Sequence, residues 1–160
     1  MNTQLHQTLK LVKNELDKNP ASVVFAQLKP GIKVEGRAME KIGAYSEFLE
    51  LTNGARFGSI DFWGYDDLKK NQFVLHERQN SKDSLISIGQ ILYEPLILDI
   101  IDQGIYTFKQ DDDPDIPMTF ISDFDYFLSN YVFGERYHEI IPDYDNDEWI
   151  LFLKKMKIIN

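Results

Sequence analysis

The N-terminal part of the chain has the apolar spacing of an amphipathic helix. Apolar side chains that lie four, three and four residues apart share one helical face, and here they are Leu5, Leu9, Val12 and Leu16. The pattern predicts a helix over residues 3–18 with Thr3 as its N-cap. Asn19-Pro20 ends this helix, because the residue before a proline avoids the helical region.

A second helical pattern follows a connection over residues 21–36. The helix is predicted to begin near Arg37 and to run to Thr52, with an apolar face made by Ile42, Tyr45, Phe48 and Leu49. Asn53-Gly54 ends it, since glycine accepts the left-handed conformation at a helix C-terminus. Within the connection, three apolar residues fit either a short strand or an anchored loop: Val23, Val24 and Phe25.

After this helix the period of the apolar positions changes from helical to alternating. Ile60, Phe62 and Gly64 alternate with polar or aromatic residues, which predicts a strand opened by Gly58. Pro95 separates two further apolar runs, and Asp102-Gln103-Gly104 has the composition of a hairpin turn. The later strands are predicted over residues 85–89, 96–101, 105–109 and 116–121, and the dense run at 96–101 is predicted to be central.

Two helices are predicted near the C-terminal end. Ser122 is the predicted N-cap of the first, with Asp125 at its third position, and Gly134 ends it. The second begins within residues 145–148 and closes at Lys154, Lys155 and Lys157, which suit the negative end of the helix dipole.

Length and composition predict one ordered domain over residues 1–160. Hydrophobic residues make up 43% of the chain and aromatic residues 13%, which is not typical of disorder. There is no cysteine, so disulfide scaffolds, zinc–thiolate sites and cysteine nucleophiles are excluded. No apolar run has the length of a transmembrane helix, and the N-terminus lacks the pattern of a signal peptide. A cytoplasmic location without membrane association is therefore expected.

The net charge of −9 is unevenly distributed along the chain. Residues 1–80 carry 11 Lys and Arg against 10 Asp and Glu, whereas residues 81–160 carry 6 against 16. Nucleic acid is not an expected partner of such a surface, because phosphate binding needs Lys and Arg. A basic protein is a plausible partner, since opposite potentials steer association; the alternative is that the acids serve solubility alone.

The sequence contains no catalytic, cofactor or metal motif. Residues 143–154 begin like a calcium loop, but Glu148 replaces its sixth-position glycine and Lys154 its final glutamate. The phosphate-binding loop, the dinucleotide glycine pattern and the nucleophile elbow are absent. The three histidines, His6, His76 and His138, do not form a paired ligand motif. We therefore predict no catalytic, cofactor-binding or metal-binding residues and a protein that is not an enzyme.

Six residues are predicted to contact a protein partner. Four aspartates occur in one loop, where they suit a basic partner or cation, or simply a solvated loop: Asp111, Asp112, Asp113 and Asp115. Trp63 and Tyr65 are the other two, because these residue types are favoured at interfaces. Trp63 fits a core position as well as an interface, and the sequence leaves both open.

The order of motifs resembles the SUKH superfamily, named in part for a fungal regulator of cell-wall synthesis. The similarity covers about residues 35–135. It begins with Tyr45-x-x-Phe48-Leu49-x-x-x-Asn53-Gly54 and the 58–63 strand, and continues through Ser87-Ile88-Gly89, Leu96-Ile97-Leu98-Asp99, Gly104-Ile105-Tyr106 and Phe124-x-x-Phe127-Leu128. One departure is Arg37-Ala38-Met39, where family members often carry a proline, and it affects the predicted start of the helix.

The resemblance implies an α+β fold with a mostly antiparallel sheet and flanking helices. For bacterial members it also implies an immunity protein, which binds and neutralises a toxin, often a nuclease; the acidic second half suits a basic toxin domain. The first alternative is an intracellular regulatory scaffold like the fungal relatives. The second is a small ligand-binding protein or enzyme, which would need a deep pocket with convergent polar groups. The sequence leaves the oligomeric state open.

Overall fold

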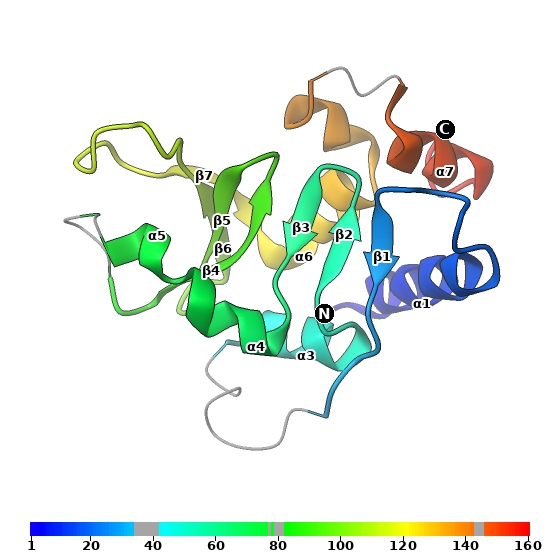
Figure 1. Ribbon diagram of the computed structural model, residues 1–160, viewed down its shortest axis with the longest axis horizontal. Coiled ribbons are helices and arrows are strands. Elements are labelled where there is room, and N and C mark those ends of the chain that lie inside the picture. The colour runs from blue at the N-terminus through cyan, green and yellow to red at the C-terminus, as the bar shows by residue number, and fades with distance from the viewer. Residues whose placement is uncertain (34–41, 77, 79–81, 143–145) are drawn as a thin grey trace.

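The fold is built on an antiparallel sheet whose strands follow one another in chain order (Figure 1). The computed structural model describes residues 1–33, 42–76, 78, 82–142 and 146–160. Every neighbouring pair of strands is antiparallel, which confirms the predicted α+β class. The strands in the described residues are β1 (Ala26–Leu28), β2 (Ala55–Phe57), β3 (Ile60–Phe62), β4 (Leu85–Ile91), β5 (Glu94–Asp99), β6 (Gly104–Thr107) and β7 (Thr119–Asp123).

Helices flank this sheet and connect parts of it. The α-helices are α1 (Thr3–Lys18), α3 (Ala44–Leu51), α4 (Tyr65–Leu68), α5 (Phe73–His76), α6 (Phe124–Tyr126) and α7 (Glu148–Lys155). A π-helix, η2 (Phe127–Val132), continues α6, and short 3-10 helices cover Lys69–Asn71 (η1) and Glu135–Glu139 (η3).

The main core lies on the face of the sheet that packs against α1, α3, α6–η2 and α7. Aromatic side chains dominate it, with Phe62 in contact with the rings of Tyr45, Phe48 and Phe124. Trp149 of α7 is fully buried against Phe57. The N-terminal and C-terminal helices therefore share one core with the sheet.

A smaller core lies on the opposite face of the sheet. It shows clearly at β5, whose side chains alternate between faces. Leu96 and Leu98 belong to the main core, whereas Ile97 packs with Leu75 of α5 and Phe108. Because β5 is buried on both faces between β4 and β6, the prediction of a central strand is confirmed.

The β2–β3 hairpin differs from the prediction. Gly58 does not open a strand; it lies in the turn with Ser59, and the sequence analysis missed β2 on its other side. The Gly58 φ angle is +61°, and a Cβ there would lie 2.3 Å from the Tyr137 hydroxyl. Glycine is needed for both reasons, since side chains rarely adopt this conformation.

Several predicted boundaries move by a few residues. The N-cap of α1 is Asn2, whose side chain accepts from the Leu5 N–H, and not Thr3. The N-cap of α6 is Asp123, and not Ser122. Pro95 lies within β5, paired with Gln90, where the missing N–H is tolerated close to the start of the strand.

The second predicted helix is described only in part. Its predicted start at Arg37 lies outside the described residues, and α3 begins at Ala44 after Gly43. Phe73–His76, which had no predicted structure, forms α5. The chain at Val23–Phe25 precedes β1, and Val23 is buried while Val24 and Phe25 are exposed.

Candidate functional site

The predicted aspartates lie together in the connection between β6 and β7, which we call the acidic loop (residues 108–118). Asp111, Asp113 and Asp115 are exposed and Asp112 is half-buried. Among the described residues, no Lys or Arg lies within 4.0 Å of their carboxylates. The negative charge of this loop is therefore not neutralised by the described part of the chain.

Hydrogen bonds within the acidic loop give it two tight turns. The Asp112 N–H donates to the Lys109 carbonyl at 3.1 Å, and the Ile116 N–H donates to the Asp113 carbonyl at 2.9 Å. The Asp115 N–H donates to a carboxylate oxygen of Asp113 at 3.0 Å. Such Asx-type turns fix the backbone, so the loop presents its aspartates from a defined conformation.

Gln110 ties the acidic loop to the turn between β4 and β5. Its side chain donates to the Tyr93 carbonyl at 2.6 Å, and its N–H donates to the Glu94 carboxylate at 2.8 Å. Leu92 and Tyr93 form the turn, and the Tyr93 side chain is 80% exposed. An exposed aromatic ring and a further carboxylate therefore lie next to the aspartates.

A cavity of about 380 Å³, which we call the loop groove, lies between the acidic loop and this turn. Its walls are mainly apolar and include Leu92, Phe108, Ile116, Ile121 and Ile140. Two acids and one base also line it: Glu94, Asp112 and Lys109. This arrangement combines an apolar surface for a partner side chain with negative charge on the adjoining loop.

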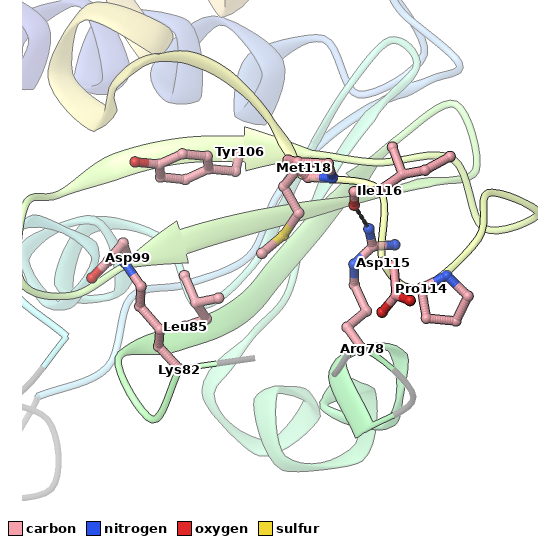
Figure 2. Close-up of a pocket in the computed structure, with 10 residues that line it drawn as sticks. Arg78, Lys82, Leu85, Asp99, Tyr106, Pro114, Asp115, Ile116 and Met118 are labelled. Carbon is pink, nitrogen blue, oxygen red and sulfur yellow. Dashed lines mark hydrogen bonds between the residues drawn. The ribbon is translucent and has the colours of Figure 1, made fainter. Parts of the chain in front are cut away.

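A second cavity of about 250 Å³, which we call the Arg78 cavity, lies on the other side of residues 116–117 (Figure 2). Arg78 is only 8% exposed and donates a hydrogen bond to the Ile116 carbonyl. Its guanidinium lies 4.2 Å from the centre of the Phe108 ring. Ile116 and Pro117 line both cavities, so they form a shared wall.

Tyr106 and Asp102 form a polar pair beside the Arg78 cavity. The Tyr106 hydroxyl donates to an Asp102 carboxylate oxygen at 3.2 Å. Burial raises the pKa of Tyr106, and the hydrogen bond and negative charge of Asp102 raise it further. Tyr106 therefore remains a neutral hydrogen-bond donor at neutral pH and is not placed to act as a base.

The two predicted aromatic contacts lie apart from the acidic loop. Trp63 follows β3 and is half-buried, and its indole N–H has no hydrogen-bond partner among the described residues. Tyr65 opens α4, and its side chain packs against the main core. Figure 1 shows α4 at the lower end of the sheet and the acidic loop at the upper left. The structure thus groups the four aspartates but does not bring Trp63 and Tyr65 to them.

No metal site is assembled in the part of the chain that the structure describes. No group of three or more His, Asp or Glu side chains is placed to hold a metal ion there. His138 contacts the Glu135 carbonyl through Nδ1 at 2.6 Å, a local contact within η3. In the same residues, no helix is long and apolar enough to cross a membrane.

Sequence reasoning missed four residues. Arg78 and Glu94 line the cavities, and Gln110 joins the acidic loop to Tyr93 and Glu94 of the β4–β5 turn. Arg78 lies in a polar stretch of the sequence, and no local pattern signals that its side chain is buried. Tyr93 and Glu94 directly precede Pro95, and in the sequence Pro95 indicates only a break between two apolar runs. Gln110 precedes the aspartates directly, but its two partners are 16 and 17 residues away in the sequence.

No family model matches the chain, and no curated protein matches it.

Proposed function

We propose that this chain is an immunity-type binding protein that neutralises a basic toxin domain through direct protein–protein contact. The observation that carries the proposal is the loop groove, an apolar cavity beside a loop of unneutralised aspartates. The contact surface proposed here consists of the acidic loop, the loop groove and the β4–β5 turn. Trp63 and Tyr65 are left out of it because they lie elsewhere.

Different kinds of side chain contribute different properties to a protein interface. Apolar and aromatic side chains in desolvated pockets contribute most of the affinity, and surrounding charges contribute association rate and specificity. Ile116 lines the loop groove and is exposed, Tyr93 is exposed in the adjoining β4–β5 turn, and Asp112 of the acidic loop lines the groove as well. A partner segment with one apolar side chain flanked by Lys or Arg has the matching chemistry.

The identity of the partner as a toxin is supported by the resemblance to the SUKH superfamily and by the charge. A nuclease binds its substrate through a basic surface, because phosphate groups need Lys and Arg. An acidic loop can occupy that surface and exclude the substrate. The proposed location is the cytoplasm, which the absence of cysteine supports.

The first experiment is an affinity capture that identifies the partner. Tagged protein is incubated with lysate and secreted fraction of the source organism at low salt, and retained proteins are eluted with high salt. We expect a basic, toxin-like protein, which must then lose its toxicity when both are expressed together. Capture of a cell-wall or regulatory protein would instead favour the scaffold alternative.

The second experiment reverses the charge of the acidic loop. Replacing Asp111, Asp112 and Asp113 with lysine removes the electrostatic attraction, so the association rate should fall about tenfold or more at low salt. Dissociation should change less, because apolar contacts in the loop groove remain. Stopped-flow or surface-based kinetics at several salt concentrations measure both rates.

The matched control reverses three exposed acids on other elements: Asp17 of α1, Glu50 of α3 and Asp66 of α4. It changes the net charge by the same amount but leaves the acidic loop intact. Equal slowing by both triple variants would show that overall charge, and not this loop, steers the partner. An unchanged rate in the loop variant would exclude the acidic loop from the interface.

A further inference from the structure

The Arg78 cavity contains a buried cation that has no acidic partner among the residues that the structure describes. Arg78 is 8% exposed, and no carboxylate of the described residues lies within 4.0 Å of its guanidinium. Of its five N–H donors, one is paired among the described residues, with the Ile116 carbonyl. Burying an unpaired charge is costly, so a guanidinium in this state is prepared for an anion.

The cavity beside it has the mixed lining of a small-molecule site and is slightly smaller than most. Its volume of about 250 Å³ lies just below the usual range of ligand pockets, which begins at about 300 Å³. In the view of Figure 2, Arg78 and Asp115 lie at one end and Lys82 and Asp99 at the other. Leu85 and Met118 provide apolar walls. An anion with a short apolar body fits this combination.

The geometry around Arg78 selects the type of anion. The guanidinium carbon of Arg78 lies over the Phe108 ring, 4.2 Å from its centre, and Arg78 itself lines the cavity. A planar fork of donors matches a carboxylate, which can accept two parallel hydrogen bonds. A bulky dianion is disfavoured, because Asp99 and Asp115 contribute two negative charges to the same lining.

We propose that the Arg78 cavity binds the carboxylate of a small ligand with an aliphatic body, such as an apolar amino acid or the C-terminal residue of a peptide. The carboxylate pairs with Arg78, and the aliphatic group packs against Leu85 and Met118. This site is separate from the loop groove, and it does not depend on the immunity function proposed above.

The test titrates three probes into ¹⁵N-labelled protein and follows the arginine side-chain Nε–H signals by NMR. N-acetyl-leucine and leucine carry the carboxylate, whereas leucinamide lacks it. We expect a saturable shift of the Arg78 signal with the first two and none with leucinamide. Tighter binding of leucine identifies a free amino acid as the ligand class, and tighter binding of N-acetyl-leucine identifies a peptide terminus.

Substitutions of Arg78 test whether this residue binds the carboxylate. Arg78→Met should weaken binding at least tenfold, equivalent to about 1.4 kcal/mol. Arg78→Lys keeps the charge but loses the planar fork, so it should give a smaller loss and also identifies the Arg78 signal. The matched control is Arg56→Met, because Arg56 also stacks on a ring, Phe25 at 4.9 Å, but lies outside this cavity. Its affinity should equal that of the wild type.

The Asp115→Asn variant tests whether the negative charge of Asp115 repels the carboxylate that Arg78 attracts. Removing this negative charge should tighten N-acetyl-leucine binding, since Asp115 lies at the Arg78 end of the lining. If Arg78→Met fails to fold, the titrations of the wild type, Arg78→Lys and Asp115→Asn still test whether Arg78 binds the carboxylate. Equal shifts with leucinamide, an absence of saturation, or unchanged affinity in a folded Arg78→Met variant would overturn the proposal.

Discussion

At the scale of single residues, Tyr45 shows how one buried hydroxyl joins a helix to the sheet. Its ring is fully buried on the face of α3 that the apolar spacing predicted. Its hydroxyl donates to the Trp63 carbonyl at 2.5 Å and approaches the Ile88 carbonyl at 3.1 Å. The same residue therefore packs in the core and satisfies backbone acceptors near β3 and β4.

The first residue-scale prediction concerns Tyr45→Phe. The change leaves the two carbonyls without this donor, so the free energy of unfolding should fall by about 1–3 kcal/mol at neutral pH. Chemical denaturation measures the loss. A variant as stable as the wild type would show that the hydroxyl contributes nothing to the connection between α3 and the sheet.

The burial of Tyr45 also predicts how the free energy of unfolding changes at alkaline pH. Burial raises the pKa of Tyr45 well above its usual value. The unfolded chain then releases the tyrosine proton above about pH 10, while the folded chain retains it. Stability is complete below that pH and falls as the pH rises, by up to about 1.4 kcal/mol per pH unit for this residue.

Tyr45→Phe should therefore make the alkaline loss of stability shallower. Tyr137 also has a pKa raised by burial, so part of the slope should remain. Tyr93→Phe is the control, because that side chain is 80% exposed and its removal should leave the slope unchanged. Equal slopes in wild type and Tyr45→Phe would contradict the assignment.

At the scale of elements, the meander depends on close backbone contact between neighbouring strands. Gly89 of β4 pairs with Phe62 of β3, and a Cβ added to Gly89 would lie 2.0 Å from the Asp61 carbonyl oxygen. That oxygen belongs to the backbone of the neighbouring strand. It cannot move without disturbing the ladder between β3 and β4.

Gly89→Ala should consequently reduce the free energy of unfolding by about 1–3 kcal/mol, the usual cost of overpacking. Gly104→Ala is the matched control on β6. There a Cβ would meet the ends of side chains, Asp102 Oδ1 at 2.8 Å and Tyr106 Cε2 at 2.9 Å, which can turn aside. Thermal and urea unfolding of both variants compare the losses, and an equal or larger loss for Gly104→Ala would refute the explanation.

At the scale of the whole molecule, the uneven charge is concentrated in space as well as in sequence. The acidic loop carries four aspartates within residues 111–115, and its carboxylates have no cation within 4.0 Å among the described residues. With a net charge of −9, the folded chain experiences self-repulsion that salt screens. The negative charge of the acidic loop therefore lowers the stability of the folded chain.

We expect the free energy of unfolding to rise as NaCl increases from about 0.01 to 0.15 M, because the Debye length falls from about 30 to about 8 Å. Replacing Asp111, Asp112 and Asp113 with lysine shifts the net charge from −9 by six, to −3. The salt dependence should then fall by roughly half or more, since self-repulsion grows with the square of the charge. Denaturation at each salt concentration measures it, and a loop variant that keeps the full dependence would locate the repulsion elsewhere.

The sequence by itself determined the features that depend on neighbouring residues. The period of the apolar positions predicted α1, and the density of the apolar run at 96–101 predicted the central position of β5. The composition of Asp102-Gln103-Gly104 predicted a turn between β5 and β6, which the structure places at residues 100–102 with Gly104 opening β6. Short elements were harder: β2 has three residues and was missed, because three residues do not establish a period. Within the candidate site, the four aspartates were predicted to contact a partner because the sequence alone shows their charge.

Only the tertiary structure decided what surrounds those aspartates. It placed Gln110 against the β4–β5 turn, separated Trp63 and Tyr65 from the acidic loop, and buried Arg78 on Phe108. These contacts join residues that are distant in the chain, and they form because burying the apolar faces of the sheet brings them together. Local spacing contains no information about them, so the loop groove and the Arg78 cavity emerge only from the fold.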